Sequence, residues 1–526
     1  MPFSLSTLSP ELNVTAAEIA ATPAPNEIYL RVSKTQIPEV CLQLYRQMGF
    51  RFCGMFAADL RATEGNFRLY YVFSEPQIDS FVLLSADVSE REFTFPSIVP
   101  EMPAANWYER EIKDMFGLVP VGHPDLRPLV VHEDWPEKYY PLRQDFPVSK
   151  QPPRVTGEYP FQMVDGEGIY EIPVGPVHAG IIEPGHFRFS ALGETIVNLE
   201  IRHFWTHKGS EKLFEQRTLA KGVALAERIS GDATIAHSLA YCQAVERLAR
   251  VAISRRAALL RTIFAELERL YFHIGDIGGI TLDVGFAFGA AQASRLKEQI
   301  LRLNERMTGN RLLRAVNVVG GITIDLDDTK LREIDLVVEK IATEVRELSE
   351  IITNTPSVID RLETTGVLTT QVAQDLGVVG VIARASGIDE DCRRDHPYAG
   401  YPDIDFTVPI YRYGDVMARL RVRVDEVAQS CHIIAQAIEK LPDEPLRVEI
   451  PSVPAGRAAL GYAESGRGRV IFWVLSADKN MVGRCKIISP SFINWPAIQH
   501  AVLGNIVPDF PLINKSFNLS YSGCDR

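Results

Sequence analysis

The sequence predicts an α+β protein in which a small N-terminal α+β domain, residues 1–150, precedes a larger, mainly helical domain, residues 170–526, with β-rich segments at both of its ends. Three observations support this prediction. A chain of 526 residues exceeds what one compact core holds, so two or three domains are expected. Strand-like runs occupy the N-terminal part, whereas helical spacing of apolar residues dominates from about 210 to 353. Prolines and glycines are concentrated between these regions.

The N-terminal domain is expected to combine strands with one helix. Residues 70–73 and 81–84 are rich in aromatic and β-branched side chains, which favours strands. Residues 106–116 place Trp107, Ile112 and Met115 at spacings that share one helical face, and Gly117 suits the end of that helix.

The helical segment continues into residues 117–127, Gly-Leu-Val-Pro-Val-Gly-His-Pro-Asp-Leu-Arg, and is followed by 133–135, Glu-Asp-Trp, and 141–146, Pro-Leu-Arg-Gln-Asp-Phe. Together these residues are very similar to the signature of the 30-kDa subunit of complex I. The resemblance implies a structural segment that helps to attach neighbouring subunits. Glu109, Arg110 and Asp114 are therefore interpreted as helix-surface or ion-pair residues.

Residues 151–169 are predicted to be a linker. Seven prolines and glycines mark this part of the chain: Pro147, Pro152, Pro153, Gly157, Pro160, Gly166 and Gly168. Given the resemblance, the linker joins two units that are separate chains in many relatives, and the protein is a natural fusion.

In the mainly helical region from about 210 to 353, one helix is expected to begin at Ser210 and another at Ser254, since serine favours helix N-termini. Gly275, Gly278 and Gly279 are expected to end the second helix. A further amphipathic pattern covers 291–307. The charged run 415–426 indicates a charged helix beside a bundle, and the last sixty-odd residues are expected to form strands and loops.

A short turn at residues 228–233, Arg-Ile-Ser-Gly-Asp-Ala, leads into a long helical pattern. It resembles the first metal-ligand motif of nickel–iron hydrogenase large subunits, Arg-Ile-Cys-Gly-x-Cys, and the matching segment of the 49-kDa subunit of complex I. From residue 170 onward the chain resembles this large-subunit family, with hydrogenase-4-like and energy-converting group 4 hydrogenases as the nearest type. Ser230 and Ala233 stand at the two cysteine positions.

The second pair of cysteine positions is also changed. The chain finishes Asn-Leu-Ser-Tyr-Ser-Gly-Cys-Asp-Arg, and alignment on the final Asp-Arg places Ser520 and Gly523 where hydrogenases have cysteine, with Cys524 one residue out of register. Residues 463–468 resemble the hydrogenase Glu-x-x-Arg-Gly segment and point to Glu464 and Arg467. Because nickel and iron in this centre need soft thiolates, we expect no metal and no hydrogen activation.

In complex I a histidine and a tyrosine bind the quinone head group, and the resemblance assigns the histidine position to His186. The tyrosine position holds Gly231, with Tyr521 and Tyr241 as candidate replacements. We expect His186, Asp232 and Asp525 to carry any chemistry. Six other groups are expected to line the same polar cavity and to couple protons: His178, Glu183, His237, Glu464, Arg467 and Arg526. A self-satisfied ion-pair network that fills the former metal site is the alternative.

Bulk properties exclude other classes of function. A net charge of −12 argues against sequence-independent nucleic-acid binding. No apolar run reaches the roughly 18 residues of a membrane span, and the N-terminus does not read as a signal peptide. Seven cysteines without a C-x-x-C pair predict reduced, mostly buried thiols and no cluster held by this chain.

The resemblance implies a peripheral-arm electron-transfer subunit of a membrane-bound, redox-driven ion-translocating complex, on the cytoplasmic side of the inner membrane. Electrons would come from an iron–sulfur cluster in an adjacent small subunit, membrane subunits of the antiporter type would move ions, and a quinone is the candidate acceptor. The alternative is a non-catalytic scaffold that joins an iron–sulfur subunit to the membrane module.

Overall fold

A computed structural model of the chain describes residues 18–20, 24, 26–149, 151–179 and 182–526. The N-terminal part forms a five-stranded sheet in the order β1-β2-β5-β4-β3, antiparallel except for the parallel pair β2 and β5. Its predicted strands are confirmed. The elements are β1 (Glu18–Ala20), β2 (Glu27–Arg31), α2 (Ile37–Leu42), β3 (Arg51–Asp59), α3 (Arg61–Glu64), β4 (Asn66–Glu75), β5 (Ser80–Ser89), β6 (Thr94–Pro96), α4 (Asn106–Phe116) and β7 (Val119–Val121).

Helix α4 ends as the sequence predicts, since Gly117 adopts a left-handed conformation with φ of 70°. Of the two expectations for this helix, surface residues are wrong, because Glu109, Arg110 and Asp114 are all buried. Ion pairs are confirmed for Arg110, which contacts Asp125 at 3.7 Å, and for Asp114, which contacts Lys113 at 3.9 Å. The Glu109 carboxylate accepts hydrogen bonds from Ser97 and the Ile98 amide, and Asp114 accepts from the amides of the 129–131 loop. These acids hold loops in place rather than facing water.

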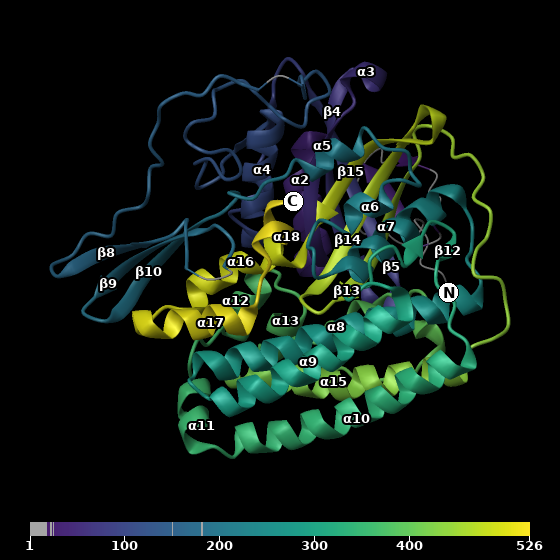
Figure 1. Cartoon of the computed structure of the whole chain (residues 1–526). Coiled ribbons are helices and arrows are strands. Elements are labelled where there is room, and N and C mark those ends of the chain that lie inside the picture. Colours follow the sequence, from purple (N-terminus) through teal and green to yellow (C-terminus); the bar gives the residue numbers. More distant parts are fainter. Residues whose placement is uncertain (1–17, 21–23, 25, 150, 180–181) are drawn as a thin grey trace.

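A second sheet projects from the body of the molecule (Figure 1). It consists of the antiparallel strands β8 (Ile169–Val174), β9 (His186–Leu192) and β10 (Thr195–Arg202). The described residues between 151 and 168 form no helix or strand, although Tyr159 and Phe161 pack against each other and against arginines of neighbouring segments. The domain boundaries at 150 and 170 stay a prediction.

The helical part forms a bundle at the base of the molecule in Figure 1. Ser254 begins α8 by accepting a hydrogen bond from the Ala257 amide, as predicted. The long bundle helices are α8 (Arg255–Asp283), α9 (Ala287–Thr308), α10 (Asp328–Thr353) and α15 (Val416–Glu439). Shorter elements connect them or lie beside them: α5 (Ser210–Phe214), α6 (Val223–Ala226), α7 (Thr234–Ala249), β11 (Asn317–Val318), β12 (Gly321–Ile322), α11 (Pro356–Leu362), α12 (Thr370–Asp375), α13 (Val381–Ala385) and α14 (Cys392–Asp395).

Two expectations about these helices are wrong. Gly275, Gly278 and Gly279 do not end α8, which continues to Asp283. A Cβ on Gly278 would lie 3.0 Å from the Cβ of Ala293, so the absent side chain allows α8 and α9 to approach closely. Helix α15 is a charged helix, as expected, but it belongs to the bundle instead of lying beside it, because its Arg419, Arg423 and Glu426 are buried and it packs along α8.

The C-terminal part begins with an antiparallel sheet, β13 (Ala458–Ser465), β14 (Gly468–Ala477) and β15 (Met481–Ile488). The residues after this sheet are helical, which corrects the expectation of strands and loops to the end. They form α16 (Pro490–Ala501), α17 (Phe510–Phe517) and α18 (Tyr521–Asp525). Each helix has a start that the residues explain: Ser489 and Ser520 accept capping hydrogen bonds, and prolines occupy the first turns of α16 and α17.

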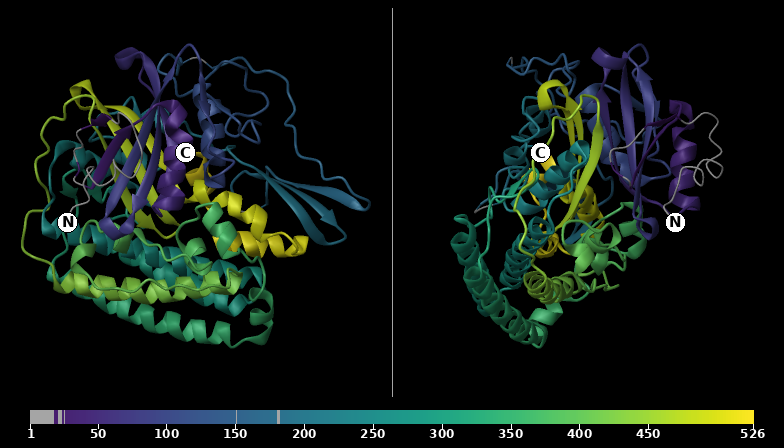
Figure 2. Two further views of the ribbon diagram at one scale, coloured as in Figure 1. Left: turned by 180° about the vertical axis from the view of Figure 1, so that it is seen from behind. Right: turned by 90° about the vertical axis from the view of Figure 1, so that its right-hand side faces the viewer.

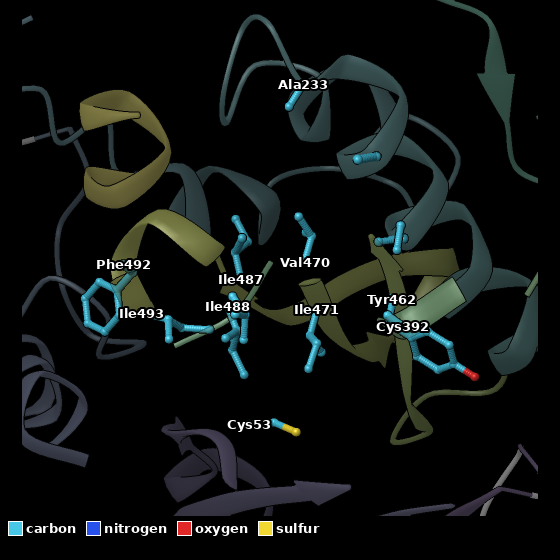
Figure 3. Packing of buried hydrophobic residues seen from close by; sticks show 14 of the residues in the cluster. Cys53, Ala233, Cys392, Tyr462, Val470, Ile471, Ile487, Ile488, Phe492 and Ile493 are labelled. Carbon is cyan, nitrogen blue, oxygen red and sulfur yellow. The ribbon is translucent and has the colours of Figure 1, made fainter. Parts of the chain in front are cut away.

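The N-terminal and C-terminal sheets lie side by side (Figure 2). Trp473 of β14 packs against Phe56 and Tyr70 of the N-terminal sheet, with ring centroids 4.9 Å apart in both pairs. In Figure 3, buried side chains of β14 and β15 lie between Cys53 of the N-terminal sheet and Ala233. One continuous core therefore joins the two parts and reaches the 228–233 turn. All seven cysteines are free and buried, as expected.

Candidate functional site

The structure brings the four former metal-ligand positions together. Ser230 lies in the turn before α7, and its hydroxyl oxygen is 3.0 Å from that of Ser520. Ser520 caps α18 by accepting a hydrogen bond of 2.8 Å from the Gly523 amide. A Cβ on Gly523 would lie 3.3 Å from the Cβ of Ser230, and the Ala233 amide donates to the Ser230 carbonyl oxygen at 2.9 Å. Two segments almost 300 residues apart therefore meet at this point.

The groups at these positions do not fit a nickel–iron centre. Ser230 and Ser520 supply neutral hydroxyls, and Ala233 and Gly523 supply no donor atom. Cys524 is fully buried, and its charged neighbours are Asp525, Arg526 and Glu111, not the serines. Burial raises the pKa of its thiol well above the usual value, which keeps it protonated. Within the described part of the chain, no three or more His, Cys, Asp or Glu side chains are arranged to hold a metal ion.

An ion pair between Arg467 and Asp232 lies beside the two serines. Arg467, in the turn between β13 and β14, donates to both oxygens of Asp232 at 3.1 and 2.8 Å. The Ser230 hydroxyl lies 2.7 Å from Asp232 Oδ1. Burial opposes ionisation of Asp232, but the Arg467 guanidinium outweighs it and lowers the pKa of the carboxyl to about 2. Asp232 is thus an anion at neutral pH, with 44% of its side chain exposed.

His237 lies one helical turn after Ala233 and is buried. Its Nδ1 is 2.9 Å from the Ala233 carbonyl oxygen, while its Nε2 has no hydrogen-bond partner among the described residues. Burial lowers the pKa of the ring to about 4, so the imidazole is neutral at pH 7.

Sequence reasoning gave no role to three residues that shape this turn. Glu268 of α8 accepts hydrogen bonds from the amides of Ile235 and Ala236 at 2.6 and 3.0 Å and so caps α7 from another helix. Burial raises the pKa of Glu268 to about 8. Tyr271 donates to the carbonyl oxygen of Asp232, and Lys208 donates to the carbonyl oxygens of Ile229 and Ser522. One sequence signal pointed to Glu268: it is an acidic residue among the apolar positions of the segment that forms α8.

The residues of the β8–β9 connection lie apart from the charge pair. His186 Nδ1 is 3.1 Å from the Gly175 carbonyl oxygen, and its ring packs on Phe161. His178 Nε2 is 2.7 Å from the Gly185 carbonyl oxygen. Across the described residues, no hydrogen bond or ion pair joins either histidine to Asp232 or Arg467. Glu183 alone reaches the site, by accepting from the Ser522 amide at 3.3 Å.

Three further predicted residues belong to separate buried groups. Asp525 accepts from the amide and hydroxyl of Thr206 at 2.9 and 2.7 Å, and burial raises its pKa to about 6. The Arg526 guanidinium pairs with Glu111 of α4 at 2.8 Å. Glu464 pairs with Arg384 at 3.0 Å. Most of the nine residues thus have partners on other elements, and their convergence on one cavity stays a prediction.

Of the two candidate tyrosines, Tyr241 is engaged elsewhere, whereas the buried Tyr521 hydroxyl has no hydrogen-bond partner among the described residues. The Tyr241 hydroxyl donates to the Leu219 carbonyl oxygen at 2.8 Å, so it is already engaged. Tyr521 packs edge-on against His203, with ring centroids 5.2 Å apart. His203 is buried beneath Trp495, and neither of its ring nitrogens has a partner among the described residues. His203 therefore contacts α18 through the Tyr521 ring.

Comparison with known proteins gives a consistent relationship. The chain is 35% identical to formate hydrogenlyase subunit 5 of Escherichia coli over 507 residues, which cover 95% of this chain and 89% of the relative. It is 36% identical to hydrogenase-4 component G of the same organism over 508 residues, covering 95% and 88%. The C/D subunit of the NADH-quinone oxidoreductase of Phocaeicola vulgatus is 30% identical over 398 residues, covering 72% and 76%.

Two sequence families match separate parts of the chain. Residues 30–152 match the respiratory-chain NADH dehydrogenase 30-kDa subunit, and residues 283–454 and 447–526 match the 49-kDa subunit. The chain belongs to the family of fused 30- and 49-kDa complex I-type subunits.

A solved structure supports this membership. A chain of the membrane-bound sulfane sulfur reductase, an archaeal respiratory membrane complex, superposes with a TM-score of 0.65 at 27% identity, covering 68% of this chain and 99% of that one. In this complex I-type fusion subunit, the 49-kDa match includes Ser520 and Gly523 but starts after the 228–233 turn. The chain is thus homologous to subunits of oxidoreductase complexes, as the sequence motifs indicated.

Proposed function

We propose that this protein is a peripheral-arm electron-transfer subunit of a complex I-like, hydrogenase-4-like respiratory membrane complex that drives ion translocation without activating hydrogen. The similarity to hydrogenase-4 component G and to the C/D subunit of NADH-quinone oxidoreductase supports membership in such a complex. One observation carries the second part of the proposal. The two serine hydroxyls lie 3.0 Å apart at two positions where the resemblance expects metal-binding thiolates, and a guanidinium–carboxylate pair lies beside them.

In this proposal an iron–sulfur cluster in an adjacent small subunit supplies the electrons, since no cluster motif occurs in the sequence. None of the described helices is long and apolar enough to cross a membrane. Membrane subunits of the antiporter type then hold the protein peripherally at the cytoplasmic face of the inner membrane and move the ions. The structural relative is described as membrane-bound, which supports this placement.

A quinone is the proposed acceptor, with Asp232 as the group beside it and His186 and Asp525, which have their own partners, as the further groups predicted to exchange protons with it. Asp232 is half-exposed and ionised, which suits it to orient a neighbouring donor. Because the structural relative belongs to a sulfane sulfur reductase, sulfane sulfur is a second acceptor class to test. The assembled complex should reduce a soluble quinone at a rate that falls at least tenfold in Asp232→Ala or His186→Ala. Asp335→Ala, an exposed acid on α10, is the matched control.

A non-catalytic scaffold is the second candidate. It is favoured because both oxygens of Asp232 accept hydrogen bonds from Arg467, and one of them also accepts from Ser230. The charges at the proposed former metal site are therefore already neutralised by each other. Quinone and polysulfide reduction unchanged in both alanine variants would support the scaffold and refute the catalytic proposal.

Metal analysis tests the absence of hydrogen activation independently. The purified complex should contain iron from its iron–sulfur partner and no stoichiometric nickel, and it should not reduce viologen dyes with hydrogen. Nickel at one ion per chain would overturn the proposal.

A further inference from the structure

Eight ionisable side chains form one connected group behind the hairpin that carries Arg467. They come from α8, the 384–393 segment, α15 and β13, and each is at most 3% exposed. They are Glu266, Arg269, His273, Arg384, Asp391, Arg393, Glu426 and Glu464. This group is called the Glu464 cluster below.

Three of its four carboxylates contact two arginines each, and Glu266 and Asp391 are the first two of them. Glu266 pairs with Arg393 at 3.1 Å and Arg269 at 3.2 Å, and it also accepts hydrogen bonds from the hydroxyls of Ser430 and Tyr401. Asp391 pairs with Arg393 at 2.6 Å and Arg384 at 3.6 Å. Both carboxylates are fully compensated and stay ionised.

The third carboxylate, Glu426, contacts Arg384 at 2.7 Å, Arg269 at 3.5 Å and His273 Nε2 at 2.7 Å. Burial lowers the pKa of His273, so its ring is neutral and donates one hydrogen bond to Glu426. Its Nδ1 has no partner among the residues that the structure describes.

Glu464 is the least compensated of the four. It contacts one guanidinium, that of Arg384 at 3.0 Å, and accepts one long hydrogen bond of 3.3 Å from the Cys392 amide. Arg384 already serves Asp391 and Glu426, and its Nη2 has no partner among the described residues. Burial and the nearby Asp391 carboxylate raise the pKa of Glu464 to about 7.

The charges of the Glu464 cluster do not balance if every acid is ionised, because four carboxylates face three guanidiniums and a neutral histidine. The neighbouring charges do not supply the missing cation. Arg469 is paired with Glu390 at 2.5 Å and Arg423 with Asp276 at 2.7 Å. The adjoining Cys392 thiol and the Tyr398 and Tyr401 hydroxyls are neutral, since burial raises their pKa values well above normal. A buried net charge is removed at least cost by binding one proton.

We propose that the Glu464 cluster is a proton-binding site, in which Glu464 holds one exchangeable proton that is coupled to the Asp232–Arg467 pair. The coupling runs through the hairpin between them. Arg269 donates to the carbonyl oxygens of Glu464 and Ser465 at 2.7 and 3.1 Å, and the Arg467 amide donates to the Ser465 hydroxyl.

Helix α13 adds a second connection. Gly380 precedes it at φ of 69°, and a Cβ there would lie 2.4 Å from the Arg467 carbonyl oxygen, while Arg384 lies four residues further on. Negative charge that arrives beside Arg467 therefore favours protonation of Glu464. When that charge leaves, release of the proton from Glu464 is favoured. This functional role rests on the proposed function, whereas the proton itself follows from the charge count.

Infrared spectroscopy of the assembled complex tests the proton directly. Besides the signals of other buried acids such as Glu268, which should be common to all variants, the wild type should show one carboxylic-acid carbonyl band that disappears between pH 6 and pH 8. Glu464→Gln should lack this band, because three carboxylates then face three guanidiniums. Glu298→Gln, an exposed acid, should keep the band. A band that persists unchanged in Glu464→Gln would overturn the proposal. If that variant does not assemble, Glu464→Asp should retain the band with a shifted frequency and pH midpoint, and an unshifted band would overturn the proposal.

The pH profile of acceptor reduction tests the coupling. A wild-type rate that changes about tenfold across the midpoint near pH 7 should become pH-independent there in Glu464→Gln. An equal loss of rate at every pH would show a structural role and overturn the coupling. If the complex reduces neither quinone nor polysulfide, the proposed function fails, while the infrared result still decides whether Glu464 binds a proton.

Discussion

Arg467 holds Asp232 by two parallel hydrogen bonds, and the same carboxylate lies 2.7 Å from the Ser230 hydroxyl. The arginine also donates to the Asn518 carbonyl oxygen and stacks on Phe272, so three separate segments meet at its guanidinium. A planar, permanently charged fork suits this position, where a lysine would satisfy only one direction. The pair thus connects the 228–233 turn, helix α8 and the segment before α18.

A double-mutant cycle should show that this pair stabilises the fold. We expect Asp232→Asn and Arg467→Met to have a coupling energy of about 1–3 kcal/mol, because the guanidinium is nearly buried and charge-assisted. Urea unfolding provides the measurement. The pair Glu298–Arg311, at 2.6 Å, lies on the surface, and its coupling energy should be much smaller because water screens both charges. Equal coupling energies in the two cycles would contradict this account.

Restoring two thiols should create a site for soft metals. In the Ser230→Cys, Ser520→Cys double variant the sulfur atoms would stand where oxygen atoms are now 3.0 Å apart, so both can bind one Cd²⁺. We expect the double variant to show the ultraviolet absorption of cadmium thiolate at one ion per chain. Each single variant is the control and should show less than a tenth of that affinity. Failure of the double variant to exceed the single ones would mean that the two segments do not meet in solution.

Replacing His203 should stabilise the protein and change its response to acid. Burial lowers the pKa of this histidine to about 3. The neutral ring therefore adds its full share to the free energy of unfolding above pH 6.5, and this share is lost as the pH falls from there towards 3. His203→Phe removes a ring with two unpartnered nitrogens and should be neutral or stabilising by about 1–2 kcal/mol at pH 7. Between pH 6.5 and 4 the wild type should lose about 3 kcal/mol more than the variant.

The measurement is the free energy of unfolding as a function of pH, and His432→Phe is a control on a histidine of α15 whose side chain is exposed. Parallel curves for wild type and His203→Phe would show that His203 is hydrated in solution.

Buried charges should hold the N-terminal sheet to the rest of the chain. The Glu111 carboxylate contacts Lys486 at 2.7 Å and Arg526 at 2.8 Å, and Glu211 shares both cations from the other side. Glu111→Gln removes one of the two carboxylates that neutralise these cations. It should lower the free energy of unfolding by about 3–5 kcal/mol. Limited proteolysis within 151–168 should then become several-fold faster.

Glu101→Gln breaks an exposed pair with Arg46 and should change stability by less than about 0.5 kcal/mol. Equal proteolysis rates in both variants would show that apolar packing around Trp473 suffices to hold the two parts together.

Local sequence signals gave correct predictions where a single residue determines the backbone conformation at its own position. Ser254 as a helix cap and Gly117 in a left-handed conformation were both predicted and confirmed. Signals of the same kind failed where packing overrides them. The glycines of α8 read as breakers, yet they lie inside a helix because a neighbouring helix needs their missing side chains. The charged residues of α15 read as a solvated face, yet their partners arrive from other elements.

The sequence alone determined the family and the fused order of its two units, because these depend on which residues occur at fixed spacings. Only the tertiary structure decided which polar side chains share an environment. A carboxylate or histidine is compensated by the nearest opposite charge in space. The residues that supply it to Asp232, Glu464 and Arg526 lie roughly 80 to 415 positions away in the chain. With these partners they form one half-exposed pair and several closed, buried networks.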